Sequence, residues 1–182
     1  MNIVRKLAQM KHDFAYIITN SIVNRIPAWW IRKNIYKLLG MKIGKNSRIG
    51  IGTIITYPKQ IVIGDRAIIN EYCFLDGRGK LYIGNNTSIS IYSKFISASH
   101  NLNSNDFAYQ YKPIVIDDYS FIGAGAIILE GTHLGKGCVI GAGAVAKGEY
   151  DNNKMYIGNP AKFVKERECD YSYLLYQNYY FR

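Results

Sequence analysis

The sequence predicts an all-β solenoid, a parallel β-helix of about five coils, and three observations support this fold class. First, an aliphatic residue recurs every six positions, most clearly at Ile116, Ile122, Ile128, Leu134 and Ile140. Second, a glycine, asparagine or aspartate usually follows it. Third, the period of six matches neither the 3.6 of a helix nor the 2 of a strand, which indicates a repeat architecture. Three hexads give the roughly 18 residues of one triangular coil.

Each position of the hexad has a place in such a coil. The aliphatic residue points inward from a flat side, and Gly, Asn and Asp accept the left-handed backbone of a corner. Coils stacked about 4.8 Å apart then satisfy one another's backbone hydrogen bonds. A small residue four positions after the aliphatic one fits the crowded interior near a corner: Ser47, Thr53, Thr87, Ser120, Ala126, Thr132 and Ala144.

The spacing of the coils predicts one long insertion. Coils begin at Ile43, Ile63, Ile83, Ile116 and Leu134, in steps of 20, 20, 33 and 18 residues. The step of 33 residues predicts a loop over residues 101–115, directly after His100. Long loops in compact domains are usually functional or disordered. Residues 43–161 are therefore predicted to form the β-helix domain, and this loop is its first candidate for function.

The two flanking segments lack the hexad. Residues 1–42 carry apolar positions at three- and four-residue steps, with a break at Pro27 and a stop at Gly40, and predict a helical cap. Such a cap would shield the apolar end of the first coil. Residues 162–182 are basic at the start and rich in tyrosine at the end. We expect a short helix and a tail there, and the sequence indicates no function for them.

Charge is concentrated in the predicted cap. The chain of 182 residues has a formal net charge of +10, and residues 1–42 hold eight basic side chains and one acid, a net of +7. Next to Trp29 and Trp30, this excess indicates contact between the cap and an anionic membrane surface, in addition to capping. Binding to nucleic acid is not predicted, because no reading motif accompanies the charge.

The compartment follows from what the sequence lacks. No apolar stretch is long enough to span a membrane, and no signal-peptide pattern is present. Cys73, Cys138 and Cys169 lie far apart without a pairing pattern, which suits a reducing compartment. We expect a cytoplasmic protein, peripheral at the inner face of the membrane, with Cys73 and Cys138 as small buried residues.

One stretch carries a family resemblance. Ile122-Gly-Ala-Gly-Ala-Ile-Ile-Leu-Glu-Gly-Thr-His-Leu-Gly-Lys-Gly-Cys-Val-Ile-Gly-Ala-Gly-Ala-Val, followed by Ile157-Gly-Asn-Pro-Ala-Lys, resembles hexapeptide-repeat acetyltransferases. The similar branch comprises galactoside, maltose and polysaccharide O-acetyltransferases, and the resemblance covers residues 43–168. It implies a left-handed β-helix, a homotrimer with active sites between subunits, and acetyl-coenzyme A as co-substrate without a metal.

His100, in Ser97-Ala-Ser-His-Asn, matches the catalytic histidine of the family. An imidazole titrates near neutral pH and can take the proton of an acceptor hydroxyl, which then attacks the thioester. Family members orient this histidine with a carboxylate or a carbonyl, and Asp106 is the only acid of the loop. His12 and His133 are interpreted as non-catalytic, and they cannot complete a three-histidine zinc site around the loop.

The resemblance also implies acceptor residues. Asn70 falls where galactoside-type enzymes place an asparagine that faces the sugar, although a corner asparagine that favours a turn explains it as well. Asp76, in Leu75-Asp-Gly-Arg-Gly, is a second candidate. Asn70 and His100 are one and a half coils apart, so they can meet only across a subunit interface.

For the cofactor, the resemblance assigns the Ala124 backbone N–H to the oxyanion and leaves room for pantetheine against the coil wall. Small residues line this wall, and the packing of the coils explains each of them taken alone equally well. Phe121 replaces the usual tryptophan of the wall, and Lys147 matches a basic residue near the adenine. Lys162 and Lys165 suit the 3′-phosphate as point charges. The small residues of the wall are Gly123, Ala124, Ala142 and Gly143.

These residues together predict an acetyl-coenzyme A-dependent O-acetyltransferase that acts on a saccharide in surface-polysaccharide biosynthesis. One alternative is N-acetylation of an amino sugar or of a small molecule such as an antibiotic, since the same base serves a hydroxyl or an amine. A second alternative is a non-catalytic β-helix scaffold. The combination of His100 with its loop argues against the scaffold.

Overall fold

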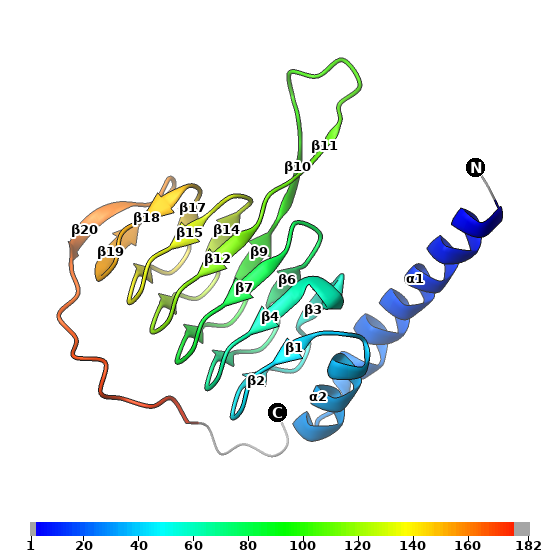
Figure 1. Cartoon of the computed structure of the whole chain (residues 1–182). Coiled ribbons are helices and arrows are strands. Elements are labelled where there is room, and N and C mark those ends of the chain that lie inside the picture. Colours follow the sequence, from blue (N-terminus) through cyan, green and yellow to red (C-terminus); the bar gives the residue numbers. More distant parts are fainter. Residues whose placement is uncertain (1–2, 177–182) are drawn as a thin grey trace.

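In the computed structural model, which describes residues 3–176, the chain folds as a left-handed parallel β-helix whose three flat sides are parallel sheets (Figure 1). Sheet A contains β1 (Lys42–Ile43), β4 (Ile61–Ile63), β7 (Leu81–Ile83), β12 (Ile114–Ile116), β15 (His133–Leu134) and β18 (Glu149–Tyr150). Sheet B contains β2 (Arg48–Ile49), β5 (Ile68–Ile69), β8 (Ser88–Ile89), β13 (Phe121–Ile122), β16 (Val139–Ile140), β19 (Lys154–Ile157) and β20 (Lys162–Glu166). Sheet C contains β3 (Ile54–Thr56), β6 (Phe74–Asp76), β9 (Lys94–Ile96), β14 (Ile127–Leu129) and β17 (Val145–Ala146).

The hexad prediction is confirmed in register. Ile43 pairs with Ile63, which pairs with Ile83, and the series continues through Ile116 and Leu134, all buried. The number of coils differs, because sheet A has six strands rather than about five. The sixth coil lacks the aliphatic signature: Tyr150 pairs with Leu134, and Tyr156 pairs with Ile140.

The small residues of the hexads lie at the corners of the coils, where the interior is crowded. All seven that the sequence singled out are buried, and the hydroxyls of the five that are serine or threonine donate to carbonyls of the next coil. Ser47 Oγ lies 2.5 Å from the Gly64 oxygen, and Ser93 Oγ lies 3.1 Å from the Gly123 oxygen. Because a larger side chain would separate the coils, size at these positions follows from the stacking distance.

Three edges join the sheets, and each is named by the sheets it connects. The A–B edge comprises residues 44–47, 64–67, 84–87, 117–120, 135–138 and 151–153. The B–C edge comprises residues 50–53, 70–73, 90–93, 123–126 and 141–144, whereas residues 158–161 connect β19 to β20 within sheet B. The C–A edge comprises residues 57–60, 77–80, 97–113, 130–132 and 147–148.

The predicted loop is a β-hairpin arm. Strand β10 (Ala98–His100) pairs antiparallel with β11 (Tyr109–Tyr111), and the arm projects away from the coils (Figure 1). The stack resumes at Ile114, so the insertion ends at Pro113 rather than at residue 115. His100 pairs with Tyr109 near the start of the turn, which holds the histidine outside the coil wall.

Two helices and two short 3-10 turns accompany the first coils: α1 (Ile3–Ser21), η1 (Val23–Arg25), α2 (Trp29–Leu38) and η2 (Pro58–Gln60). Arg32 in α2 is fully buried and donates to the Ile49 carbonyl at 2.8 Å. The Asn20 amide exchanges two hydrogen bonds with the Ile55 backbone, at 2.8 and 2.9 Å. These side chains satisfy backbone groups that have no preceding coil, whereas the rest of α1 points away from the stack (Figure 1).

The predicted C-terminal helix is wrong, and the last six residues of the predicted tail lie outside the described residues. Residues 162–166 form β20, which pairs antiparallel with β19 and satisfies the open edge of the last coil. The chain then runs back along the A–B edge (Figure 1). Arg167 Nη1 donates to the Tyr119 carbonyl at 2.7 Å, and the Leu175 N–H donates to Asn86 Oδ1 at 3.2 Å. No helix among the described residues is long and apolar enough to cross a membrane.

Candidate active site

His100 is held on the arm by a backbone acceptor and two rings. Its Nδ1 lies 2.8 Å from the Phe107 carbonyl oxygen, so Nδ1 carries the proton and Nε2 is left with its lone pair. The imidazole stacks on Phe107 at a centroid distance of 4.2 Å and lies against Tyr109 at 4.2 Å. This geometry fixes both the tautomer and the plane of the imidazole.

The orienting group is not Asp106. That side chain is exposed near the tip of the arm, and the Phe107 carbonyl occupies the Nδ1 of His100. The sequence carried no signal for this role, because a backbone carbonyl is independent of the side chain. The tip that supplies it is fixed locally: the Asn101 N–H donates to the Ala108 carbonyl, and the Ser104 hydroxyl accepts from the Ala108 N–H.

A buried carboxylate lies at the base of the arm beside His100. Glu130, 6% exposed, accepts a hydrogen bond from Ser99 Oγ at 3.1 Å and one from Lys147 Nζ at 2.7 Å. Burial alone would raise the pKa of Glu130, but these partners outweigh it and the pKa is lowered. The three side chains and His100 line one open pocket with residues of the arm. Glu130 was not predicted from the sequence. It is the single charged residue between Ile122 and Thr132, and this isolation was a signal that could have identified it.

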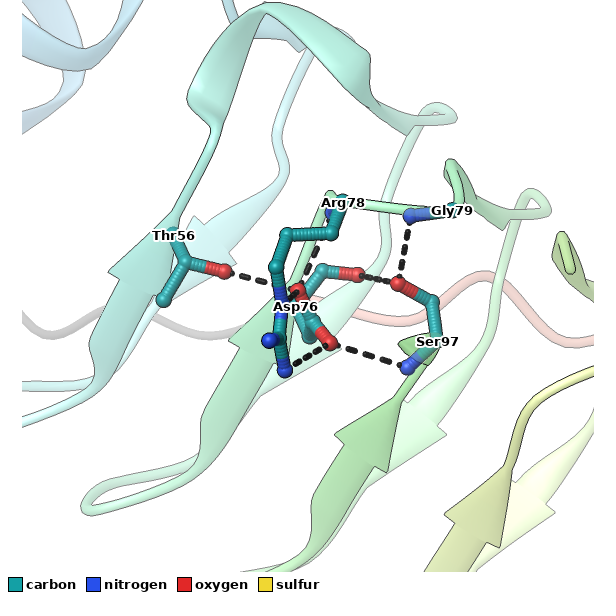
Figure 2. Close-up of polar contacts among 5 residues, drawn as sticks. All are labelled: Thr56, Asp76, Arg78, Gly79 and Ser97. Carbon is teal, nitrogen blue, oxygen red and sulfur yellow. Dashed lines mark hydrogen bonds and ion pairs between the residues drawn. The ribbon is translucent and has the colours of Figure 1, made fainter. Parts of the chain in front are cut away.

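The prediction that Asp76 faces the acceptor is wrong. Its side chain is fully buried and accepts five hydrogen bonds, so no oxygen is available to a substrate (Figure 2). Arg78 forms a fork with Nε on Oδ1 and Nη2 on Oδ2, both at 3.0 Å, and the Ser97 N–H donates to Oδ2 at 3.0 Å. Asp76 therefore joins three consecutive coils below the arm.

Asn70 and His100 lie on different edges of the same chain. Asn70 follows β5 on the B–C edge, half-buried, and its backbone N–H donates to the Ile89 carbonyl at 2.9 Å. His100 extends from the C–A edge on the arm. One chain therefore does not bring the two side chains together, and the role of Asn70 stays a prediction.

The B–C edge also carries the small residues predicted for the cofactor. Ala124, Ala142 and Gly143 are exposed there, while a Cβ on the buried Gly123 would come within 2.4 Å of the Ala142 nitrogen. The carbonyl of Ala124 accepts from Gly143, but its N–H donates to no backbone group among the described residues. The same holds for the N–H groups of Ile51, Glu71, Ile91 and Ala142, so an N–H without a backbone acceptor is a property of this edge rather than of Ala124.

Phe121 stands on the outer face of sheet B between Ser88 and Val139, 39% exposed. It directly follows the A–B edge and lines a pocket with Arg167 and Tyr173 of the C-terminal tail. Its role, like those of Gly123, Ala124, Ala142 and Gly143, stays a prediction.

Comparison with known proteins identifies the family. Residues 113–148 match the model of the bacterial transferase hexapeptide family (six repeats). The protein named "Putative colanic acid biosynthesis acetyltransferase WcaF" of Escherichia coli K12 is 32% identical over 136 residues, 75% of each chain. The chain belongs to the hexapeptide-repeat acetyltransferase family. The resemblance read from the sequence is thereby confirmed.

Solved structures of hexapeptide-repeat acetyltransferases share the whole fold. A hexapeptide-repeat-containing acetyltransferase from Vibrio cholerae superposes with a TM-score of 0.80 at 25% identity, covering 88% of this chain and 93% of that one. A maltose O-acetyltransferase from Clostridium difficile 630 gives a TM-score of 0.79 at 25% identity, covering 89% of both chains. The Vibrio protein has also been solved with acetyl-coenzyme A, at 23% identity and a TM-score of 0.78, with 92% of this chain and 91% of that one covered.

Within this acetyltransferase, the predicted phosphate-binding lysines share one face. Lys162 pairs with Ile157 and Lys165 pairs with Met155, and the register shifts between the two pairs. The extra residue of this bulge brings two lysines three positions apart to the same side of β20. Lys147 lies instead in the His100 pocket, paired with Glu130, and its contact with adenine stays a prediction.

His133 lies outside this arrangement. It faces outward from β15, with Nδ1 3.0 Å from Glu149 Oε2 and Nε2 3.1 Å from Asp117 Oδ2. Partial burial would lower the pKa of His133, but the two carboxylates outweigh it and raise it. The side chain of His12 lies outside the described residues. Within residues 3–176, no group of three or more His, Cys, Asp or Glu side chains is arranged to hold a metal ion.

Proposed function

We propose that this acetyltransferase transfers the acetyl group of acetyl-coenzyme A to a hydroxyl of a saccharide in surface-polysaccharide biosynthesis, with His100 as general base. The observation that carries the proposal is the Phe107 carbonyl at Nδ1, which leaves Nε2 free to accept a proton. The choice of acceptor is supported by the relatives, one named for colanic acid biosynthesis and one for maltose O-acetylation.

In the proposed reaction, Nε2 takes the proton of the acceptor hydroxyl as its oxygen attacks the thioester carbonyl carbon. The resulting oxyanion accepts a hydrogen bond from the Ala124 N–H, a kind of contact worth about 3 kcal/mol in acyl-transfer enzymes. Collapse breaks the carbon–sulfur bond, and the leaving thiolate takes the proton from the imidazolium. The exposed lysines on β20, Lys162 and Lys165, are assigned to the 3′-phosphate of the cofactor.

The direct test is release of free coenzyme A from acetyl-coenzyme A in the presence of sugars and lipid-linked glycans. Acceptor-dependent release with a saccharide is the expected result. Release only with amino sugars, at their nitrogen, would favour the alternative of N-acetylation. No release with any acceptor would leave the scaffold as the better description.

We also propose a homotrimer in which each site is shared between two chains. His100 lies on the C–A edge, whereas Asn70 and the Ala124 N–H lie on the B–C edge, so a second copy is needed to complete the site. Closed cyclic assembly lets the C–A edge of each chain meet the B–C edge of the next.

Mixed assemblies test the shared site. His100→Ala and Asn70→Ala are each expected to be inactive, whereas co-expressed chains should regain about a quarter of the activity by random mixing in a ring of three. A chain that carries both substitutions, mixed with either single variant, is the matched control and should regain none. A monomer in sedimentation velocity that retains full activity would contradict the shared site.

We further propose that residues 1–42 contact an anionic membrane surface, which would place the enzyme at the cytoplasmic face. The apolar stripe of α1 supports this: Leu7, Met10, Phe14 and Ile17 are each more than half exposed. The basic residues are not equivalent, however. Arg32 is buried, and Lys33 donates to the Gly44 carbonyl at 3.2 Å, so both belong to the fold.

Charge reversal should therefore be limited to the exposed basic residues. Substitution of Lys6, Arg25, Lys37 and Lys42 by Glu should abolish co-sedimentation with anionic vesicles and leave the melting temperature unchanged, since each basic residue contributes about 1 kcal/mol near such a surface. The matched control reverses four exposed lysines of the coils: Lys80, Lys94, Lys112 and Lys136. Absence of binding by the unmodified protein at low salt would rule out this contact.

A further inference from the structure

Two tyrosines form an exposed stack on the B–C edge. The rings of Tyr72 and Tyr92 lie 5.5 Å apart between centroids with an interplanar angle of 18°, and the residues are 52% and 56% exposed. Both adopt the left-handed backbone conformation, with φ of 57° and 63°, which L residues rarely adopt. Glycine or asparagine would suit these corners better, so packing of the coils does not require a large ring there.

The contrast with Tyr119 is informative. Tyr119 has a φ of 61° on the A–B edge, and its ring is covered by Tyr171 and Tyr173 of the tail, at centroid distances of 4.8 and 5.4 Å. That corner tyrosine therefore has a structural role in anchoring the tail. The Tyr72–Tyr92 pair keeps about half of its surface in solvent.

The order of residues along the B–C edge locates the stack relative to the reaction. Successive coils present Gly52, Tyr72, Tyr92, Gly125 and Gly143 at equivalent positions. The ring of Tyr72 lies over Gly52, where a Cβ would approach it to 2.4 Å, while the space beside Gly125 and Gly143 is open. The stack thus ends one coil before Ala124.

On the proposed function, the carbonyl of the acetyl group lies at Ala124, and the cofactor extends toward Ala142 and Gly143. The molecule whose hydroxyl attacks must approach that carbonyl from the other side, at the level of Tyr92. Two polar side chains lie in the same coils: Asn70 and Ser90, both half-buried, directly follow β5 and β8. An aromatic face beside an amide and a hydroxyl matches a sugar, whose ring has an apolar C–H face and a rim of hydroxyls.

We propose that Tyr72 and Tyr92 form a stacking platform for a pyranose ring of the saccharide acceptor, with Asn70 and Ser90 contacting its hydroxyls. This inference rests on the proposed function and adds specificity-determining residues to it. It also explains why two aromatic residues occupy left-handed corners beside the reacting group.

The test measures acceptor kinetics with two probes, maltose and methyl β-galactoside. Tyr72→Asn and Tyr92→Asn preserve the left-handed corner, and each should raise the KM for the accepted probe at least about tenfold, equivalent to about 1.4 kcal/mol. The KM for acetyl-coenzyme A should remain within about twofold, a change of less than about 0.5 kcal/mol. Tyr72→Phe retains the ring and should behave like the unmodified enzyme. Tyr82→Thr, at an exposed tyrosine of β7, is the matched control.

Three outcomes would overturn the platform. Unchanged acceptor KM in both asparagine variants, with an active parent enzyme, would remove it and leave the proposed function intact. A shift in sedimentation coefficient in the same variants would instead assign the pair to an interface between chains. Failure of the unmodified enzyme to acetylate any saccharide would refute the proposed function, and the platform with it.

Discussion

His100→Ala is expected to lower kcat by about 100- to 10,000-fold, the usual loss when a general base is removed. The KM for acetyl-coenzyme A and the melting temperature should change little. The reason is structural: His100 stands on a projecting arm, its ring packs against Phe107 and Tyr109 of the same arm, and it lies outside the coil core. Steady-state release of coenzyme A, together with thermal unfolding monitored by circular dichroism, would measure both quantities.

The matched control is His133→Ala. His133 is the second histidine with a described side chain, and it contacts two carboxylates on the outer face of sheet A rather than the pocket. Its loss should leave kcat within about twofold and cost at most about 1 kcal/mol of stability, because the three groups are partly exposed. If the His100 variant kept more than a tenth of the activity, the base would have to be another group.

The fold could be predicted from the sequence because the hexad is a local signal repeated many times. Every inward aliphatic residue and every small corner residue reports the same geometry, so errors at single positions do not matter. The sixth coil was not predicted, because Tyr150 and Tyr156 occupy inward positions at which the hexad pattern has aliphatic residues. Strand β20 was not predicted, because its partner is the open edge of the last coil, which exists only after the stack has formed.

The candidate site was less predictable. The insertion after β9 marked His100, since an interruption of a regular repeat is visible in the sequence. The group that orients it is the carbonyl of Phe107, which no side-chain pattern encodes. Glu130 and Lys147, which are 17 positions apart, meet because Ile128 stacks on Ala146 in adjacent coils, and this register exists only in the folded stack. Asp76 was misassigned because the donors that enclose its carboxylate, Thr56 and the Ser97 N–H, belong to the coils before and after it and approach it only once the coils have stacked.

Asp76→Ala is expected to destabilise the fold by about 3 kcal/mol, the order of loss when one partner of a buried ion pair is removed. The substitution leaves Arg78, Thr56 and the Ser97 N–H without their acceptor below the arm (Figure 2). Because the guanidinium of Arg78 is 34% exposed, water can compensate part of the loss. Urea unfolding would measure the change, with Asp106→Ala, an exposed acid of the arm, as the control expected to stay within about 0.5 kcal/mol.

Protonation of the Asp76 carboxylate should contribute to the loss of folding stability at low pH. Burial would raise the pKa of Asp76, but the hydrogen bonds from Arg78 and Thr56 outweigh it, so its pKa lies below the ordinary value of 3.8. A depressed pKa means that the stabilisation is present above the ordinary value and is lost as the pH falls through the lower, folded-state value. Asp76→Asn should therefore lower the melting temperature at neutral pH and weaken its dependence on pH below about 4. An unchanged acid dependence in this variant would show that other carboxylates control it.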